Sequence, residues 1–517
     1  MSNCKSFWGV CSRTLYSCYW KKQKEPNESK QKPCLWFSIV ILVTVLALIW
    51  MYICLVSSND QDDVNWKLFT ALHLWINWFM VLIILSALLT AYCVFLLLFA
   101  LIQVFLKEPL NLHCTHKILL LGGIVLIAAG VTGISVVWKE DWLTVLLSLE
   151  ATAPFLQFGA VGALTLLSKV VFQAIFTTHQ KFSRCIIGTA FALVTLLILL
   201  WPLCIWSPCF IDKLPPKPEL IGHRGAPMLA PENTIMSFNR SVSCGVKAFE
   251  TDVQLSEDNV PFLMHDHNNS NFLERTTNAK EIFPNKVLNA SASLTWAEYQ
   301  RLNAGEWFVK TDPFRTVSQL SESVKALARN QTIPSLRQLL QLAQEHNISV
   351  MFDLYSPDQE HKTVETILDS GIDPSLVLWL PSAERDYVRK RAPQFIQVYD
   401  NIAEGNRLNL KYSKISTKKI RELTKNNTRV NLWTVNERWL FSLLWCAGAS
   451  SVTTNSCHTL KDMEQPDWTI PLKLYKIIWL CVDIGSILIM AVLFAYQWRK
   501  DNFPRSGLTT IRRSSLG

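Results

Sequence analysis

The sequence predicts an α-helical bundle of six membrane spans joined to an α/β domain that folds as a TIM-like (β/α)8 barrel. Three observations predict this division. Half of the 517 residues are hydrophobic, and the mean hydropathy is +0.19. Six apolar runs are long enough to cross a bilayer, which takes about 20 helical residues. One long polar stretch, 219–466, alternates between short β-rich and helical patterns.

The apolar runs divide the chain. Five expected spans precede the polar stretch and one follows it: 35–56, 72–106, 118–138, 142–167, 185–206 and 474–498. The predicted parts are a tail at 1–34, five transmembrane helices within 35–206, a proline-rich linker at 207–218, the polar domain at 219–466, a sixth transmembrane segment at 467–498 and a tail at 499–517.

The positions of lysine and arginine predict which side of the membrane each segment faces. Both tails are basic, as are the loop with Lys107 and Lys117 and the loop with Lys169 and Arg184. With six crossings these four segments fall on one side, which the positive-inside rule makes cytoplasmic. The polar domain and the acidic loop 57–67 then lie outside. We expect a multi-pass protein of the plasma membrane, with both termini cytoplasmic and the polar domain extracellular; an internal membrane is the alternative.

The net charge of +9 does not predict nucleic-acid binding. The basic residues gather beside apolar segments, which is typical of membrane topology and contact with anionic lipid. A basic surface interleaved with aromatic residues, as nucleic-acid readers have, is missing from the sequence. The expected partner is therefore the lipid bilayer, and the sequence carries no signal for an oligomeric state.

The polar domain also carries marks of the secretory lumen. We expect N-glycosylation at its six N-x-[ST] sequons, at Asn239, Asn268, Asn289, Asn330, Asn347 and Asn426. Five cysteines fall on the same, oxidising side: Cys204, Cys209, Cys244, Cys446 and Cys457. A disulfide among them is expected, with its pairing open.

Eight short β-rich runs with helices between them favour the barrel over a doubly wound sheet, which is the structural alternative. The expected strands are 220–223, 248–255, 261–265, 349–354, 376–380, 395–398, 430–435 and 451–454. The irregular stretch 268–332 is expected as an insertion after the third strand.

Titratable residues recur where these strands end, which is where a barrel gathers its active site. Strand one ends in His223 and Arg224, strand two in Glu250 and Asp252, strand three in His265, and strand four in Asp353. A strand's period of two sends Glu250 and Asp252 to the same face. Three carboxylates and two imidazoles suit a hard divalent cation, Ca²⁺ or Mg²⁺, and acid–base chemistry on a phosphodiester. Arg224 offers two donors to a phosphate.

The motifs around these residues resemble one enzyme family. IGHRGAPMLAPENT, ETDVQLSEDNVPFLMHD, LERTTN and LNAGEWF resemble the glycerophosphodiester phosphodiesterase family, and the six-span arrangement is similar to its vertebrate membrane branch with an extracellular catalytic domain. The resemblance implies a hydrolase acting on glycerophosphodiesters or on inositol-linked phosphodiesters, either glycerophosphoinositol or the anchor of GPI-linked proteins.

The resemblance also implies a role for each residue. The metal ligands would be Glu250, Asp252 and Asp353, the catalytic pair His223 and His265, and the phosphate-binding residue Arg224. Trp433, in WTVN, would line the substrate cleft. Of the two histidines, we expect His223 to act as the base and His265 as the acid.

Two departures from the family pattern bear on these expectations. Tyr355 stands where a lysine or arginine is usual, so the substrate cleft there gains a hydroxyl and loses a cation; Asn455 replaces a usual aspartate. They support the alternative of a catalytically degraded six-span signalling or adhesion protein, which the intact carboxylates and histidines oppose. Arg275, in LERTTN, is expected to pin the insertion through a salt bridge.

Overall fold

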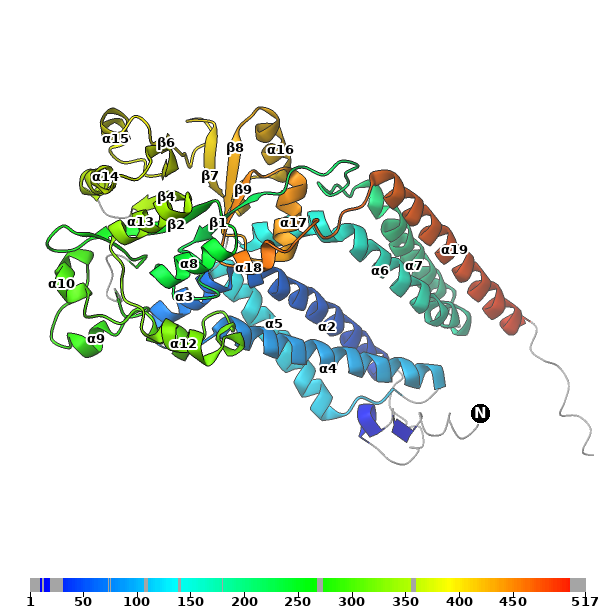
Figure 1. The fold of residues 1–517 in the computed structure, drawn as a ribbon. Coiled ribbons are helices and arrows are strands. Elements are labelled where there is room, and N and C mark those ends of the chain that lie inside the picture. Colours follow the sequence, from blue (N-terminus) through cyan, green and yellow to red (C-terminus); the bar gives the residue numbers. More distant parts are fainter. Residues whose placement is uncertain are drawn as a thin grey trace, which may run out of the picture. The chain divides into compact units, whose positions relative to one another are not determined.

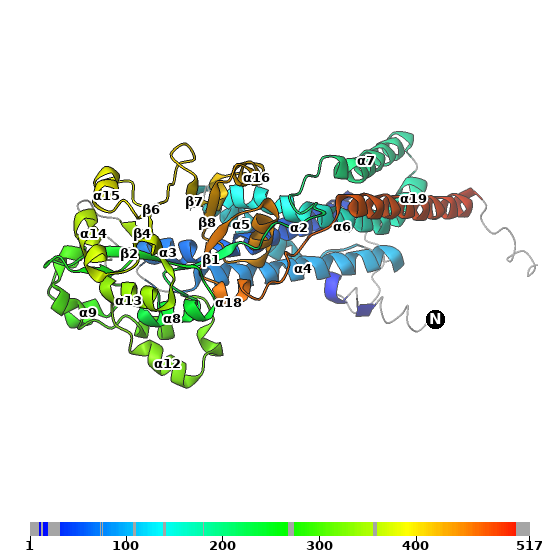
Figure 2. The same cartoon turned by 45° about the horizontal axis from the view of Figure 1, so that its top comes forward.

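The computed structural model describes residues 10–11, 14–18, 31–72, 74, 76–106, 110–137, 141–178, 180–266, 273–354 and 359–502 (Figures 1 and 2). The chain divides into two compact units. The first comprises Met1–Leu146, Lys217–Phe441 and Ala449–Glu464, and the second Leu147–Pro216, Ser442–Gly448 and Gln465–Gly517.

Six helical segments among the described residues are long and apolar enough to cross a membrane, as the hydropathy pattern predicts. They are Leu35–Phe69, Trp78–Leu106, Cys114–Val136, Trp142–Thr177, Lys181–Leu203 and Leu472–Asn502. The first begins with the apolar helix α2 (Gln31–Val56) and continues into the polar η1 (Ser57–Asp60) and α3 (Gln61–Leu72). The others are built on α4 (Trp78–Leu106), α5 (Cys114–Val137), α6 (Asp141–Thr177), α7 (Lys181–Leu200) and α19 (Leu472–Asn502).

Helices α2, α4 and α5 pack together in the first unit through apolar side chains and a few polar contacts. Trp50 is buried in this bundle and donates its indole N–H to Ser86 Oγ at 2.8 Å. Gly130 makes room for that indole, since a Cβ there would lie 2.2 Å from a ring atom of Trp50. Small residues and interhelical hydrogen bonds of this kind hold apolar helices together where burial from water adds little.

In the second unit, α6, α7 and α19 make similar contacts. Thr165 and Ser486 share a hydroxyl hydrogen bond of 2.6 Å, and Trp479 Nε1 donates to the Leu199 carbonyl at 3.1 Å. A disulfide joins Cys209 to Cys446.

The polar domain is a nearly closed barrel of eight parallel strands, which confirms the (β/α)8 prediction. The strands are β1 (Glu219–His223), β2 (Ala248–Leu255), β4 (Ser349–Leu354), β5 (Val377–Trp379), β6 (Ile396–Gln397), β7 (Arg407–Lys411), β8 (Arg429–Trp433) and β9 (Ser451–Thr454). Their order is β6-β5-β4-β2-β1-β9-β8-β7. Tyr399, just after β6, links the two ends, because its N–H donates to the Arg407 carbonyl at 2.9 Å and its carbonyl accepts from the Asn409 N–H at 2.7 Å.

Two strand assignments differ from the prediction. The third run, β3 (Pro261–Leu263), pairs antiparallel with β2 and is not part of the barrel wall. Its place is taken by β7, which the sequence pattern did not indicate. The barrel interior is polar at this point, because Asn409 of β7 is buried and accepts a hydrogen bond of 2.7 Å from Asn431 of β8. The asparagine interrupts the apolar pattern of β7, so the sequence did not indicate a strand there.

Helices surround the barrel (Figure 1). They are α8 (Ile235–Ser243), α13 (Leu336–His346), α14 (Gln359–Ser370), α15 (Arg385–Arg391), α16 (Thr417–Lys425), α17 (Arg438–Ala447) and α18 (Cys457–Leu460). The insertion after β3 holds the short helices α9 (Ala279–Ile282), α10 (Trp296–Tyr299), α11 (Glu306–Thr311) and α12 (Glu322–Arg329). It has its own apolar cluster, in which Tyr299 and Phe262 are fully buried with ring centroids 4.2 Å apart.

A second disulfide, Cys244–Cys457, joins the end of α8 to α18 across 213 residues of sequence. The two disulfides thus pair four of the five cysteines among which a disulfide was expected. The fifth, Cys204, is free and exposed.

Replacing Cys244 and Cys457 together by serine is expected to lower the free energy of unfolding by about 2–4 kcal/mol, because the bond constrains a long loop of the unfolded chain. The measurement is the thermal midpoint of the purified protein. Cys204→Ser is the matched control and leaves the midpoint unchanged. Equal midpoints for the double variant and the control would contradict the role given to this bridge.

Candidate active site

The parallel pairing of β1, β2 and β4 brings the titratable residues of these strands to one level of the barrel. His223 pairs in register with Glu250, and Asp252 pairs with Asp353. Since the carboxyl ends of parallel strands meet at the same edge, four residues from separate parts of the chain come together there.

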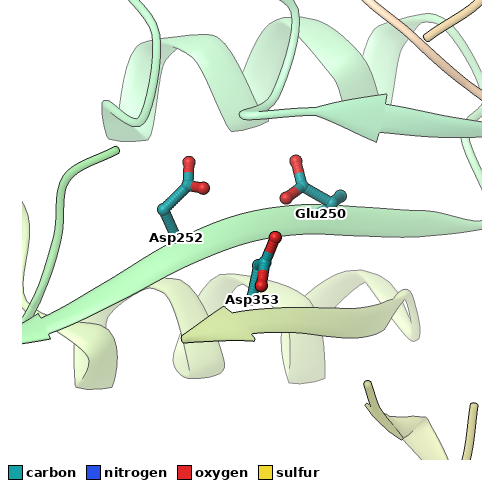
Figure 3. A group of neighbouring side chains, drawn as sticks. All are labelled: Glu250, Asp252 and Asp353. Atoms are coloured by element: carbon teal, nitrogen blue, oxygen red, sulfur yellow. The ribbon is translucent and has the colours of Figure 1, made fainter. Parts of the chain in front are cut away.

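Three carboxylates form the centre of this group. One oxygen each of Glu250, Asp252 and Asp353 lies within 4.8 Å of the others. In Figure 3, Glu250 and Asp252 project from the same side of β2 and Asp353 lies beside them on the neighbouring strand. Burial, and then the charge of Asp252, raise the pKa of Glu250 well above its ordinary value. Clustered carboxylate oxygens that repel one another are a donor set suited to Mg²⁺ or Ca²⁺.

Arg224 lies against these acids rather than apart from them. Its main-chain N–H donates to Glu250 Oε2 at 3.0 Å, and its Nε lies 3.3 Å from Asp252 Oδ2. Its Nη1 donates to Glu232 Oε1 at 3.2 Å. The guanidinium is thereby held at the edge of the carboxylate group, where it can meet a bound anion.

The glycines beside Arg224 shape the turn itself. Gly225 has a φ of +89°, and a Cβ there would lie 2.5 Å from Ser237 Oγ on α8. A Cβ on Gly222 would lie 2.5 Å from the Gly225 carbonyl oxygen. Both glycines are therefore required for the chain to fold tightly against α8, which sets the position of His223 and Arg224.

His223 ends β1 and contacts Asn455, just beyond β9. The distance from His223 Nδ1 to Asn455 Oδ1 is 2.6 Å, and Nε2 lies 3.9 Å from Glu250 Oε2. Burial, and then the charge of Arg224, lower the pKa of His223 to about 3. The ring is thus neutral at neutral pH.

His265 reaches the same site from β3, the strand outside the barrel wall. Its Nδ1 lies 3.2 Å from Asp266 Oδ1. Both histidines line a cavity of about 420 Å³ together with Arg224, Glu250, Asp353 and Trp433. The structure therefore brings together the residues expected as metal ligands, catalytic pair and phosphate-binding residue.

A buried group of charges supports this site. Arg275 donates to both Asp266 oxygens, through Nε at 3.2 Å and 3.3 Å, and to Glu232, through Nη1 at 2.8 Å. Burial alone would raise the pKa of Glu232, but Arg275 and then Arg224 lower it well below its ordinary range. Arg275 thus pins the insertion to the loop after β1, as its motif predicts. The sequence did not indicate that Glu232 and Asp266 share one network; only the folded chain shows it.

The sequence reasoning missed a second wall of the site. A smaller hollow of about 120 Å³ shares His223, Arg224 and His265 with the larger cavity and is also lined by residues of η1 and α3, among them Asp62 and Trp66. The cluster of acidic residues in loop 57–67 was the feature of the sequence that could have drawn attention to this segment. Composition alone, however, does not show what such a loop contacts.

The remaining expected residues fall in different places. Trp433 ends β8 and is 37% exposed at the cavity. Tyr355 and Asn268 lie outside the described residues, so Tyr355 stays a prediction for the substrate cleft. The other five sequon asparagines, Asn239, Asn289, Asn330, Asn347 and Asn426, are exposed.

Replacing Arg275 by methionine is expected to lower the free energy of unfolding by about 3–5 kcal/mol, because Glu232 and Asp266 lose their buried countercharge. Arg337→Met is the control: its exposed pair with Asp369, at 3.7 Å, contributes about 1 kcal/mol or less. Denaturant titration of both variants measures the difference, and similar losses would show that the buried network does not hold the insertion.

Comparisons with known proteins agree with this geometry. Two models of the glycerophosphoryl diester phosphodiesterase family match residues 223–376 and 429–456, which contain the carboxylates and both histidines. The chain is 42% identical over 524 residues to glycerophosphoinositol inositolphosphodiesterase GDPD2 of Mus musculus, covering 98% of this chain and 96% of that protein. It is 40% identical to glycerophosphodiester phosphodiesterase domain-containing protein 5 of Homo sapiens, covering 95% and 83%.

Among solved structures, a glycerophosphodiester phosphodiesterase from Agrobacterium tumefaciens aligns with a TM-score of 0.38 and 17% identity, over 48% of this chain and all of that one. The full-length relatives are the informative ones, because their similarity extends through the apolar helices as well as the barrel. The site geometry and these relatives together place the chain in the glycerophosphoryl diester phosphodiesterase family, as a phosphodiesterase.

Proposed function

We propose that this protein is a membrane-anchored phosphodiesterase whose extracellular barrel hydrolyses glycerophosphodiesters or inositol-linked phosphodiesters by acid–base catalysis with two histidines. The observation that carries the proposal is the convergence of three carboxylates, Glu250, Asp252 and Asp353, beside a cavity that two of them line together with His223 and His265.

The three carboxylates are the proposed ligands of a divalent cation, Ca²⁺ or Mg²⁺. Their chemistry fits: all three donors are oxygens, two of the residues are buried, and their mutual repulsion is relieved by a cation. When bound, a divalent cation supplies charge stabilisation to the nonbridging oxygens of a phosphodiester. Arg224, at the edge of the carboxylates, is proposed to contact the same phosphate.

The partners of the two histidines favour different roles. His223 Nδ1 lies 2.6 Å from the amide oxygen of Asn455, an acceptor, so Nδ1 carries the proton and Nε2 the lone pair with which a general base takes a proton from the attacking hydroxyl. His265 Nδ1 contacts the carboxylate of Asp266, a partner that orients the ring of a general acid donating a proton to the leaving alcohol. We therefore propose His223 as the base and His265 as the acid.

The location of the barrel outside the cytosol is supported by several features. The loop 57–67, expected on the outer side from the charge pattern, contacts the barrel in the first unit. Two disulfides lie in the segments assigned to that side, and the described sequon asparagines are exposed. We propose both termini in the cytoplasm, the barrel outside the plasma membrane, and glycans on the sequons.

The substrate class follows from the site and from the relatives. A cavity of about 420 Å³ accommodates a small polyhydroxylated alcohol on either side of the phosphate. A relative in Mus musculus is named as a glycerophosphoinositol inositolphosphodiesterase, so glycerophosphoinositol is the first substrate to test. The alternative of a degraded signalling or adhesion protein gains no support from the site, in which every expected ligand and both histidines are present.

Asp353→Asn is expected to lower kcat/KM by at least about 100-fold, since a metal ligand contributes to charge stabilisation in the transition state. Chelation of divalent cations should abolish wild-type turnover, and added Mg²⁺ or Ca²⁺ should restore it. Glu345→Gln, on the exposed face of α13, is the control and keeps full activity. Turnover that survives both chelation and Asp353→Asn would rule out the metal site.

Two substrates whose leaving groups differ in their need for a proton distinguish the proposed roles of the two histidines. His265→Ala should lower turnover of glycerophosphoinositol by about 100-fold or more but spare a p-nitrophenyl phosphodiester, whose leaving group needs no proton. His223→Ala should lower both. Phosphorus NMR of the products identifies the bond broken in wild type. The reverse pattern of losses would exchange the two roles.

A further inference from the structure

A segment from the apolar-helix region reaches the catalytic end of the barrel within the first unit. Asn59, in η1, is 1% exposed and donates through Nδ2 to the Thr434 carbonyl at 2.9 Å. Its Oδ1 accepts from the N–H groups of Asn436 and Glu437 at 2.8 Å and 3.2 Å, and its carbonyl accepts from Asn436 Nδ2 at 3.0 Å. These four bonds fix η1 on the loop that follows β8.

The next helix, α3, begins on the catalytic side of this anchor. Trp66 stacks over the Arg275 guanidinium at 4.8 Å, and Tyr412 donates a hydrogen bond to Asp60. Between these contacts, Asp62 Oδ2 accepts a hydrogen bond from Asn455 Nδ2 at 2.8 Å. Asn455 is itself 3% exposed, and its main-chain N–H donates to Asn436 Oδ1 at 2.8 Å. The amide of Asn455 therefore lies between Asp62 and His223 in a rigid setting.

The chemistry of the two neighbours determines which way this amide points. Asp62 Oδ2 accepts a hydrogen bond from Asn455 Nδ2 at 2.8 Å, so the NH₂ group of Asn455 faces Asp62. The amide oxygen then faces His223 Nδ1 at 2.6 Å. Because a carbonyl oxygen also only accepts, Nδ1 must carry the proton, and Nε2 must carry the lone pair.

We propose that Asp62 is a positioning residue for catalysis: through Asn455 it holds His223 in the tautomer whose Nε2 faces the cavity as a proton acceptor. This inference rests on the proposed role of His223 as the base. It makes the segment 57–66, which lies outside the barrel sequence, a part of the catalytic machinery.

The same geometry explains the departure from the family pattern at position 455. An aspartate there would set two carboxylates against each other at hydrogen-bond distance from Asp62. Asn455 supplies the donor instead. Burial, and then the charge of Asp63, raise the pKa of Asp62 to about 8; Glu232 adds to this rise, whereas Arg224 and Arg275 lower it. Asp62 Oδ2 accepts the hydrogen bond from Asn455 in the ionised form and also in the acid form whose proton is on Oδ1, so the proposal rests on the contact and not on the charge.

The test exchanges the two side chains. The full-length enzyme with bound divalent cation is assayed with glycerophosphoinositol as wild type, Asp62→Asn, Asn455→Asp and the double exchange. Asp62→Asn lets the amide of Asn455 rotate, and Asn455→Asp creates carboxylate repulsion. We expect kcat of each single variant to fall by about 10-fold to 100-fold, with KM little changed. This loss is a part of the rate enhancement that a general base contributes. The double exchange restores an oxygen facing His223 Nδ1 and a donor between the two residues, and should recover kcat to within about fivefold of wild type.

Asp386→Asn, an exposed carboxylate-to-amide change on α15, is the control and keeps wild-type kinetics. Thermal midpoints of all variants separate misfolding from a catalytic loss. Full activity of Asp62→Asn would overturn the proposal, because an amide would then replace the carboxylate without consequence. So would single-variant losses that the double exchange fails to recover in folded protein. An inactive wild type would instead refute the proposed function itself.

Discussion

Mutual repulsion among buried carboxylates is the constraint around which this barrel is organised. Parallel strands end at one edge, so the acids on β2 and β4 meet there with little water to screen them. Arg224 offsets part of their charge through its contacts with Asp252 and Glu232. Opposed charges of this kind suit the proposed binding of a cation and a phosphate.

The charge balance extends beyond the strand ends into the insertion. Arg275 joins Glu232, from the loop after β1, to Asp266, beside His265. One buried guanidinium thereby connects the two histidine-bearing segments, although β3 lies outside the barrel wall. The insertion consequently serves as part of the site's framework, and the position of His265 depends on it.

The two histidines have different hydrogen-bond partners, on which their proposed roles rest. His223 meets an amide oxygen and His265 meets a carboxylate. The amide is in turn held by Asp62, nearly 400 residues earlier in the chain. A hydrogen-bond chain of this type links the apolar-helix region to His223, the proposed base, within one compact unit. The same contacts connect a segment of the apolar-helix region with the candidate active site.

The sequence by itself determined the six apolar helices, the alternating barrel and the acidic residues at the strand ends, because each of these follows from local periodicity or from a motif read along the chain. Tyr355 remains an expectation, since it lies outside the described residues. Only the tertiary structure decided that β3 lies off the barrel wall, that β7 with its buried Asn409 belongs to it, and that Asp62 and Trp66 border the catalytic site. These features depend on contacts between distant segments, and a polar residue carries no local signal of the partner that makes its burial favourable.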